Sequence, residues 1–290
     1  MTSASLQQAT SAVISPRRRF SELLRHPLPL GGAALLALIV LISLVGPMIV
    51  QNDPLTVNMA ERLQSPSWKY PLGTDAMGRC LFTRLALGAQ YTLGITALVV
   101  AAIIGIGIPS GLWSGYKGGR LDAFIMRFND GITALPEFIL AIAIAGFLGS
   151  SLTHLMIAIV AVKWTGYARI VRSVVLSEKE KEYVLAARVG GCSTWKIMWR
   201  HLTPQIMPPV LVLAALDVGK VILTISSLSY LGLGAQPPTP EWGAMLNDGR
   251  PYFQSAPELM LIPGAAIFLV VMACNLVGDG LRDIFDVKGS

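Results

Sequence analysis

The sequence predicts an all-α polytopic membrane protein with about six transmembrane helices. Of its 290 residues, 53% are hydrophobic and only 14% are charged, whereas a soluble domain usually carries about 25% charged residues. Several apolar runs reach the roughly 20 residues that an α-helix needs to cross a bilayer. Polar segments rich in proline, glycine or charge separate these runs and define the loops.

The chain begins with a polar tail, residues 1–27, that contains the cluster Arg17–Arg19. The apolar run that follows, residues 28–50, is too long for the core of a signal peptide, and no small-x-small cleavage site follows it. We therefore expect a first transmembrane helix at 28–50. Because arginines are enriched on the cytoplasmic side of membranes, the tail is expected in the cytoplasm.

The first helix places the polar segment 51–88 outside the cell. The other five spans are expected within residues 89–283. The second of the six spans, 91–113, holds four glycines, a residue type that lets membrane helices pack closely. They are Gly94, Gly105, Gly107 and Gly111.

Charged residues inside the spans are candidates for the lining of a translocation path, since such residues normally face the bundle interior or a water-filled route. The third span, 123–147, contains Asp130 and Glu137, which are seven residues apart and therefore expected on one helical face. The fifth span, 206–233, contains Asp217 and Lys220, whose spacing also lets them neutralise each other. For both pairs a purely structural role is the alternative.

A second outer segment, residues 235–258, separates the fifth span from the sixth, which begins near residue 259. It is rich in proline and carries Trp242 among other aromatic residues, a composition that an interfacial aromatic belt also has. Six spans place both chain ends in the cytoplasm, including the C-terminal residues 284–290.

The stretch 177–204 is charged and lies between apolar runs. Trp195, Met198, Trp199 and Leu202 have the spacing of one helical stripe, Ser193 precedes this helix as a candidate cap, and the Gly190–Gly191 pair separates it from an earlier helix. One interpretation is an amphipathic loop on the bilayer surface. The other is a docking element for a cytosolic partner.

The same stretch resembles the EAA loop of ABC importer permeases, which engages the ATPase. Its Ala186-Ala187 pair is followed by three residues, Gly191 and, thirteen positions later, Pro204. Leu185 stands where this loop usually has glutamate, and Thr203 where it usually has leucine. The resemblance implies that these residues couple the chain to an ATPase: Tyr183, Ala186, Ala187, Gly191, Trp195 and Pro204.

Further motifs resemble the C-type permease subunits of dipeptide, oligopeptide and nickel importers. They are PLGTDxxGR at 71–79, EWG at 241–243 and NLVGDGLRD at 275–283. Cys80 replaces the aspartate that usually follows the first of them. The resemblance implies the type I ABC importer permease fold and contacts with an extracytoplasmic solute-binding protein. Candidate contact residues are Gly73, Asp75, Arg79 and Trp242.

The resemblance also implies a non-catalytic subunit in the bacterial plasma membrane that carries peptides or nickel and other metal chelates. The expected partners are a homologous B-type permease, two cytosolic ATP-binding subunits, the solute-binding protein and membrane lipid. A proton- or ion-coupled secondary transporter is one alternative, and a structural membrane subunit is another. A secondary transporter is expected to show internal repeats with broken helices, and no clear repeat is visible in the sequence.

The residues themselves argue against several other functions. The Gly219-Lys220 pair lacks the glycine and the hydroxyl residue of a phosphate-binding loop, so the chain is not expected to hold ATP. Its three cysteines and three histidines are scattered, which predicts no metal site, no cofactor and no catalytic residues. The net charge of +6 is explained by basic cytosolic segments, and no nucleic-acid partner is expected.

Overall fold

The computed structural model describes residues 27–286, with side chains up to residue 283. The expected cytoplasmic tail with its arginines, except Pro27, and residues 287–290 lie outside the described part. The described chain is helical and contains no strand. In order, its helices are α2 (Pro27–Ile49), η1 (Met59–Glu61), α3 (Leu81–Lys117), α4 (Gly119–Thr133), α5 (Glu137–Leu148), α6 (Leu152–Glu178), α7 (Glu182–Val189), α8 (Thr194–Lys196), η2 (Ile197–Leu202), α9 (Thr203–Tyr230), α10 (Trp242–Gly249), η3 (Arg250–Tyr252) and α11 (Glu258–Asp286).

Within residues 27–286, five helices are long and apolar enough to cross a membrane. They are α2, α3, α6, the continuous helix Thr194–Tyr230 and α11. Helices α4 and α5 together make up a sixth candidate span, bent by 89° at the break between them. The all-α polytopic fold predicted from hydropathy is therefore confirmed.

The third span differs from the single helix expected over 123–147. Helix α4 ends at Thr133, and α5 begins only at Glu137. Pro136 disfavours helical backbone at the residue before it and here begins α5 at its N-cap. Asp130 and Glu137 therefore lie on two different helices, and the argument that seven residues place them on one face does not hold.

The glycines of α3 allow it to lie directly against α6. Those that face α6 are Gly107, Gly111 and Gly115. A Cβ atom on Gly111 would lie only 2.5 Å from the carbonyl oxygen of Ala168, so any larger residue would push the two helices apart. Of the glycines expected to pack, Gly94 and Gly105 have open space around them instead.

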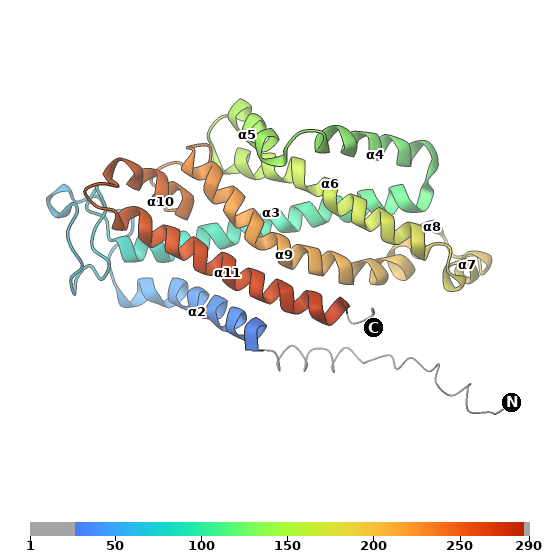
Figure 1. Ribbon diagram of the computed structural model, residues 1–290, viewed down its shortest axis with the longest axis horizontal. Helices are drawn as coiled ribbons and strands as arrows, with labels where there is room; N and C mark the ends of the chain where they lie inside the picture. Colours follow the sequence, from blue (N-terminus) through green and yellow to red (C-terminus); the bar gives the residue numbers. More distant parts are fainter. Residues whose placement is uncertain (1–26, 287–290) are drawn as a thin grey trace.

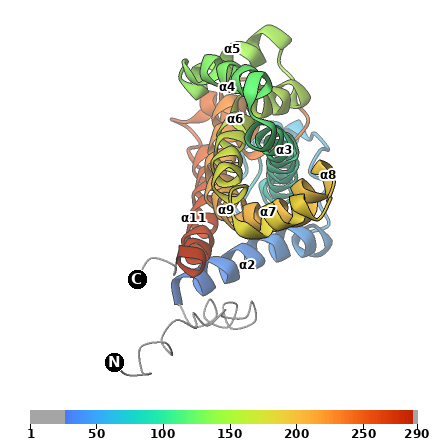
Figure 2. The same ribbon diagram turned by 90° about the vertical axis from the view of Figure 1, so that its right-hand side faces the viewer.

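The helices form an elongated bundle whose two ends differ (Figure 1). One end carries the segment between α2 and α3 together with α10. The opposite end carries α7 and α8, and the start of α2 and the end of α11 are directed toward it but stop short of it. Seen from that end, α4 and α5 lie on one side of the bundle and α2 lies on the other (Figure 2). This arrangement groups the two expected outer segments at one end and the expected docking stretch at the other.

Candidate functional site

Helices α7 and α8 carry large apolar side chains that the rest of the described chain leaves uncovered. The exposed fraction is 90% for Val189 and 59% for Trp195. A patch of exposed apolar side chains on a protein surface outside the membrane marks a site of protein interaction. We call this group the α7–α8 surface, and its large members are Tyr183, Leu185, Val189, Trp195 and Trp199.

The turn between the two helices depends on Gly191. Its φ of 76° lies in the left-handed region, which glycine adopts without strain. The turn is closed by the backbone N–H of Cys192, which donates to the carbonyl of Ala187 at 3.0 Å. Helix α8 then begins with the capping side chain of Ser193, which accepts from the N–H of Lys196 as the sequence predicted.

The apolar stripe predicted in this region is divided in the structure. Met198 and Leu202 are buried, but Trp195 and Trp199 are exposed and their rings lie 5.4 Å apart. The reason is that Ile197–Leu202 forms a π-helical turn, which changes the angle between successive side chains. Turns of this kind are frequent at functional sites. The two tryptophans are thereby added to the α7–α8 surface.

Helix α7 is fastened to the ends of two spans. The Tyr183 hydroxyl donates to Glu178 at the end of α6 at 2.8 Å, and burial together with this carboxylate raises the pKa of Tyr183 to about 12. The guanidinium of Arg188 lies 5.7 Å from the centre of the Tyr116 ring at the end of α3, within the range of cation–π attraction. Val184 is fully buried. Helix α7 is thus tied by side-chain contacts to the ends of α3 and α6.

A second contact at this end joins three helices. Arg172 of α6 donates from Nε and Nη2 to the two carboxylate oxygens of Asp122 on α4, both at 2.6 Å. The hydroxyl of Ser114 on α3 also donates to Asp122. Lys179 reaches the carbonyl oxygen of Gly115 at 3.1 Å. A bidentate pair of this kind fixes orientation as well as distance.

We expect the Asp122–Arg172 pair to contribute about 1–2 kcal/mol to the stability of the bundle, because the pair is bidentate and largely sheltered. A double-mutant cycle of Asp122→Asn and Arg172→Gln, read by unfolding in mixed detergent, measures this coupling. The matched control is Asp130→Asn with Arg169→Gln, an exposed pair with a single contact of 3.3 Å, for which less than about 0.5 kcal/mol is expected. Equal coupling energies for both pairs would contradict the view that the bidentate Asp122–Arg172 contact stabilises the bundle more than an exposed ion pair does.

A cavity of about 460 Å³ lies between the α4–α5 break, α6 and α9. Three of the four predicted path residues line it, namely Glu137, Asp217 and Lys220. Glu137 pairs with Lys163 of α6 at 2.6 Å, and the Lys163 side chain is only 9% exposed. Asp217 and Lys220 lie 3.5 Å apart, so they pair loosely with each other and also line the cavity.

The fourth predicted path residue, Asp130, does not line this cavity. Its carboxylate pairs with Arg169 of α6, and both side chains are more than half exposed. The α4–α5 break is the reason, because it directs Glu137 toward α6 and α9 while Asp130 stays on α4.

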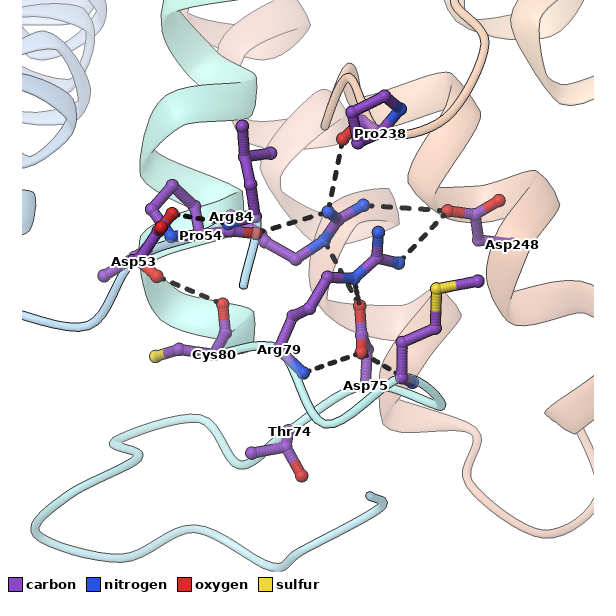
Figure 3. A network of polar contacts seen from close by, with 12 residues as sticks. Asp53, Pro54, Thr74, Asp75, Arg79, Cys80, Arg84, Pro238 and Asp248 are labelled. Carbon is purple, nitrogen blue, oxygen red and sulfur yellow. Dashed lines mark hydrogen bonds and ion pairs between the residues drawn. The ribbon is translucent and has the colours of Figure 1, made fainter. Parts of the chain in front are cut away.

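The four residues predicted to contact a binding protein are all buried at the opposite end of the bundle. Gly73 and Arg79 belong to the segment before α3, and Trp242 begins α10. Asp75 accepts from Arg79 Nε at 2.7 Å and from two backbone N–H groups (Figure 3). In this structure all four are covered by neighbouring segments, and their contact with a binding protein stays a prediction.

Sequence reasoning missed Glu241, which is completely buried. Its two carboxylate oxygens accept from the N–H groups of Gly243 and Ala244 at 3.0 Å each, which caps α10. The hydroxyl of Thr92 on α3 lies 3.3 Å from the same carboxylate, and the indole N–H of Trp242 donates to the carbonyl of Leu85 on α3 at 2.9 Å. Together these contacts hold α10 against α3. The sequence signals were the EWG motif at 241–243, to which no role was given for the glutamate, and an acid directly before an apolar helix start.

The cysteine at position 80, where the similar permeases usually have aspartate, also has a structural consequence. Cys80 is the N-cap residue of α3, and its side chain makes no capping hydrogen bond. Aspartate at an N-cap normally accepts from the first turn of a helix. The family's aspartate would therefore cap α3, and this chain begins the helix without that bond.

Comparison with known proteins identifies similar chains. Residues 107–288 match the family described as the binding-protein-dependent transport system inner membrane component, and residues 15–66 match the N-terminal transmembrane domain of oligopeptide transport permease C. The chain is 40% identical to the dipeptide transport system permease protein DppC of Alkalihalophilus pseudofirmus, over 95% of this chain and 91% of the relative. It is also 40% identical to the nickel transport system permease protein NikC of Escherichia coli K12, over 87% and 91%, and to the probable D,D-dipeptide transport system permease protein DdpC of the same strain, over 90% and 88%.

Proposed function

Since the chain belongs to the family of binding-protein-dependent transport system inner membrane components, we propose that it forms one half of the translocation path of an ATP-binding-cassette importer. The other half is a homologous B-type permease. The complex also contains two cytosolic ATP-binding subunits, one of which docks on the α7–α8 surface, and an extracytoplasmic solute-binding protein that delivers the cargo. Both chain ends lie in the cytoplasm. The cargo is a peptide or a metal chelate, in keeping with the dipeptide and nickel systems of the relatives.

The observation that carries this proposal is the exposed apolar α7–α8 surface at the end of a continuous helix. Helix Thr194–Tyr230 begins at that surface and is long and apolar enough to cross a membrane, and its part α9 bears Asp217 and Lys220 at the cavity beside the α4–α5 break. A tilt of the surface therefore moves a cavity wall directly. Because the ATPases close on ATP, nucleotide binding favours one of two packings of the spans.

Within the path, Glu137 and Lys163 form a charged wall across the α4–α5 break. We expect Glu137→Gln to lower uptake and to destabilise the bundle by about 1–2 kcal/mol, since it leaves the sheltered Lys163 without this carboxylate. The exchanged variant Glu137→Lys with Lys163→Glu restores the pair and is expected to restore the yield of folded chain. Uptake assays and unfolding midpoints measure the two effects. Unchanged yield and uptake in Glu137→Gln would remove this pair from both roles.

Copurification tests the proposed function. A tagged chain, extracted in mild detergent from its native membrane, is expected to retain partners that hydrolyse ATP, and uptake is expected to stop when ATP is depleted. A proton- or ion-coupled transporter would instead lose uptake when an ionophore dissipates the gradient, without ATP-hydrolysing partners. A structural membrane subunit would leave uptake unaffected by substitutions along the cavity.

A further inference from the structure

A second cavity, of about 570 Å³, opens at the outer end of the bundle between the segment before α3 and α10. Its walls are largely apolar and include Met59, Met77 and Met245. Methionine side chains adapt to ligands of different shape. Its size lies within the range of pockets for small molecules. The charged residues that line it are Arg62, Asp75, Arg79, Arg84 and Asp248, which leaves one positive charge in excess.

The guanidinium of Arg84 is buried but loosely held (Figure 3). Its side chain is 2% exposed, and it lies 3.3 Å from Asp75 and 3.6 Å from Asp248. Its other contacts, to the carbonyl oxygens of Pro54 and Pro238, are 3.4 Å long. Charge-assisted hydrogen bonds are usually about 2.7–2.9 Å long, and the Asp122–Arg172 pair of this molecule has two of 2.6 Å. All the contacts of Arg84 are therefore long, and a ligand carboxylate that approaches it more closely would form a stronger contact.

The two carboxylates beside Arg84 differ in how firmly they are bound. Asp75 is engaged by Arg79 Nε at 2.7 Å and by backbone N–H groups of its own turn. Asp248 on α10 only approaches the Nη2 atoms of Arg79 and Arg84, at 3.7 and 3.6 Å, and its side chain is 37% exposed. Burial raises the pKa of Asp248, against the effect of the two arginines. Asp248 thus occupies the position of a counter-ion that another carboxylate can replace.

We propose that this cavity binds the carboxylate of a small acid with an apolar body, of the size of a short peptide, against Arg79 and Arg84 in place of Asp248. Two adjacent guanidinium groups match the geometry of a carboxylate, and the methionine-lined walls receive the rest of the ligand. The arginines lie at the base of the cavity, with side chains 4% and 2% exposed, which favours a slender free ligand over a side chain of a docked protein. The site serves as a receiving position on the outer side of the path, and this last role rests on the proposed function.

Binding to the purified full-length chain in lipid nanodiscs tests the proposal without any partner subunit. The probe is radiolabelled glycyl-leucine, and its C-terminal amide is the matched ligand without the carboxylate. We expect saturable binding of the acid and at least about tenfold weaker binding of the amide, as befits the loss of a charge-assisted contact. Equal binding of acid and amide would overturn the proposal. If glycyl-leucine does not bind, the proposal is also overturned. The remaining ligand for the cavity would then be a carboxylate on the surface of a docked protein.

Three substitutions test the roles of the charged residues: two are expected to weaken binding of the acid, and one is expected to tighten it. Arg79→Lys and Arg84→Lys are expected to weaken binding of the acid about tenfold, since lysine lacks the planar fork. Asp248→Asn is expected to tighten it several-fold, because it removes the competing carboxylate while keeping the shape. The matched control is Glu258→Gln, an exposed acid at the same end outside the cavity lining, with no expected change. Weaker binding in a folded Asp248→Asn chain would show that the network is only a scaffold.

The result of the binding experiment can be distinguished from the result of the copurification and uptake experiments that test the proposed function. Retained binding together with a failure to copurify ATP-hydrolysing partners would overturn the importer role alone. ATP-driven uptake without carboxylate-dependent binding would overturn the outer site alone. If Arg84→Lys fails to fold, as judged by its elution in size-exclusion chromatography, Arg79→Lys and Asp248→Asn still decide the question.

Discussion

Uptake driven by ATP is expected to fall to background in a Gly191→Arg variant, while the chain still inserts into the membrane. Apart from its two chain neighbours, no atom of the described residues lies within 4 Å of a Cβ built on Gly191, so the new side chain projects outward onto the α7–α8 surface without a clash. The left-handed φ of 76° costs a non-glycine residue about 1–2 kcal/mol, which a bundle of this size tolerates. The loss is therefore expected in docking of the ATPase and not in folding.

The matched control is Gly191→Asn, because asparagine accepts the left-handed conformation better than other side chains. It is expected to retain most of the uptake. A second variant, Ala186→Asp, places a charge on an exposed position of α7 and is expected to fail like Gly191→Arg. The measurements are uptake into proteoliposomes and copurification of ATP-hydrolysing partners. Normal transport by well-expressed Gly191→Arg and Ala186→Asp would refute the assignment of this surface.

Loss of the Glu241 carboxylate is expected to release α10 from α3 and to destabilise the chain by about 3 kcal/mol. Removal of a helix cap costs about 1–2 kcal/mol, and each buried donor left unsatisfied costs about 1–3 kcal/mol. In Glu241→Ala, the N–H groups of Gly243 and Ala244 and the hydroxyl of Thr92 all lose their acceptor. Because α10 forms a wall of the outer cavity, carboxylate binding there is expected to fail as well.

Glu241→Gln is the matched control, since glutamine keeps one oxygen acceptor and nearly the same shape. It is expected to lose about half as much stability. Unfolding in mixed detergent gives the free energies, and the fluorescence of Trp242, which is buried beside Glu241, reports whether α10 has moved. If alanine and glutamine give the same stability as the native chain, the carboxylate does not hold α10.

The long apolar runs were predictable as helices because a chain in lipid must satisfy its own backbone hydrogen bonds. The helix boundaries differ most from expectation where amphipathic sequence lengthens an apolar helix. Helix α3 starts ten residues before the expected Tyr91, and the fifth span begins at Thr194 instead of near Ile206. Hydropathy detects the apolar part of a helix and gives no information about how far the same helix continues into polar sequence.

Pairing between distant residues was beyond sequence reasoning. Lys163 can be read from the sequence as a basic residue in an apolar run, but its contact with Glu137 depends on the bend at Pro136. Arg172 was equally visible, and its bidentate contact with Asp122 depends on how α4 lies on α6. A single sequence records which charges are present, whereas the packing of helices decides which of them meet.

The sequence by itself determined that this chain is a bundle of long apolar helices and which family its motifs resemble. These properties follow from local composition and spacing, which fix where backbone and side chains are stable. Only the tertiary structure decided that Gly73, Asp75, Arg79 and Trp242 are buried, that Glu137 and Asp217 line one cavity, and that Arg84 is loosely held beside Asp248. Burial and pairing depend on distances between segments far apart in the chain, and local pattern carries no information about those distances.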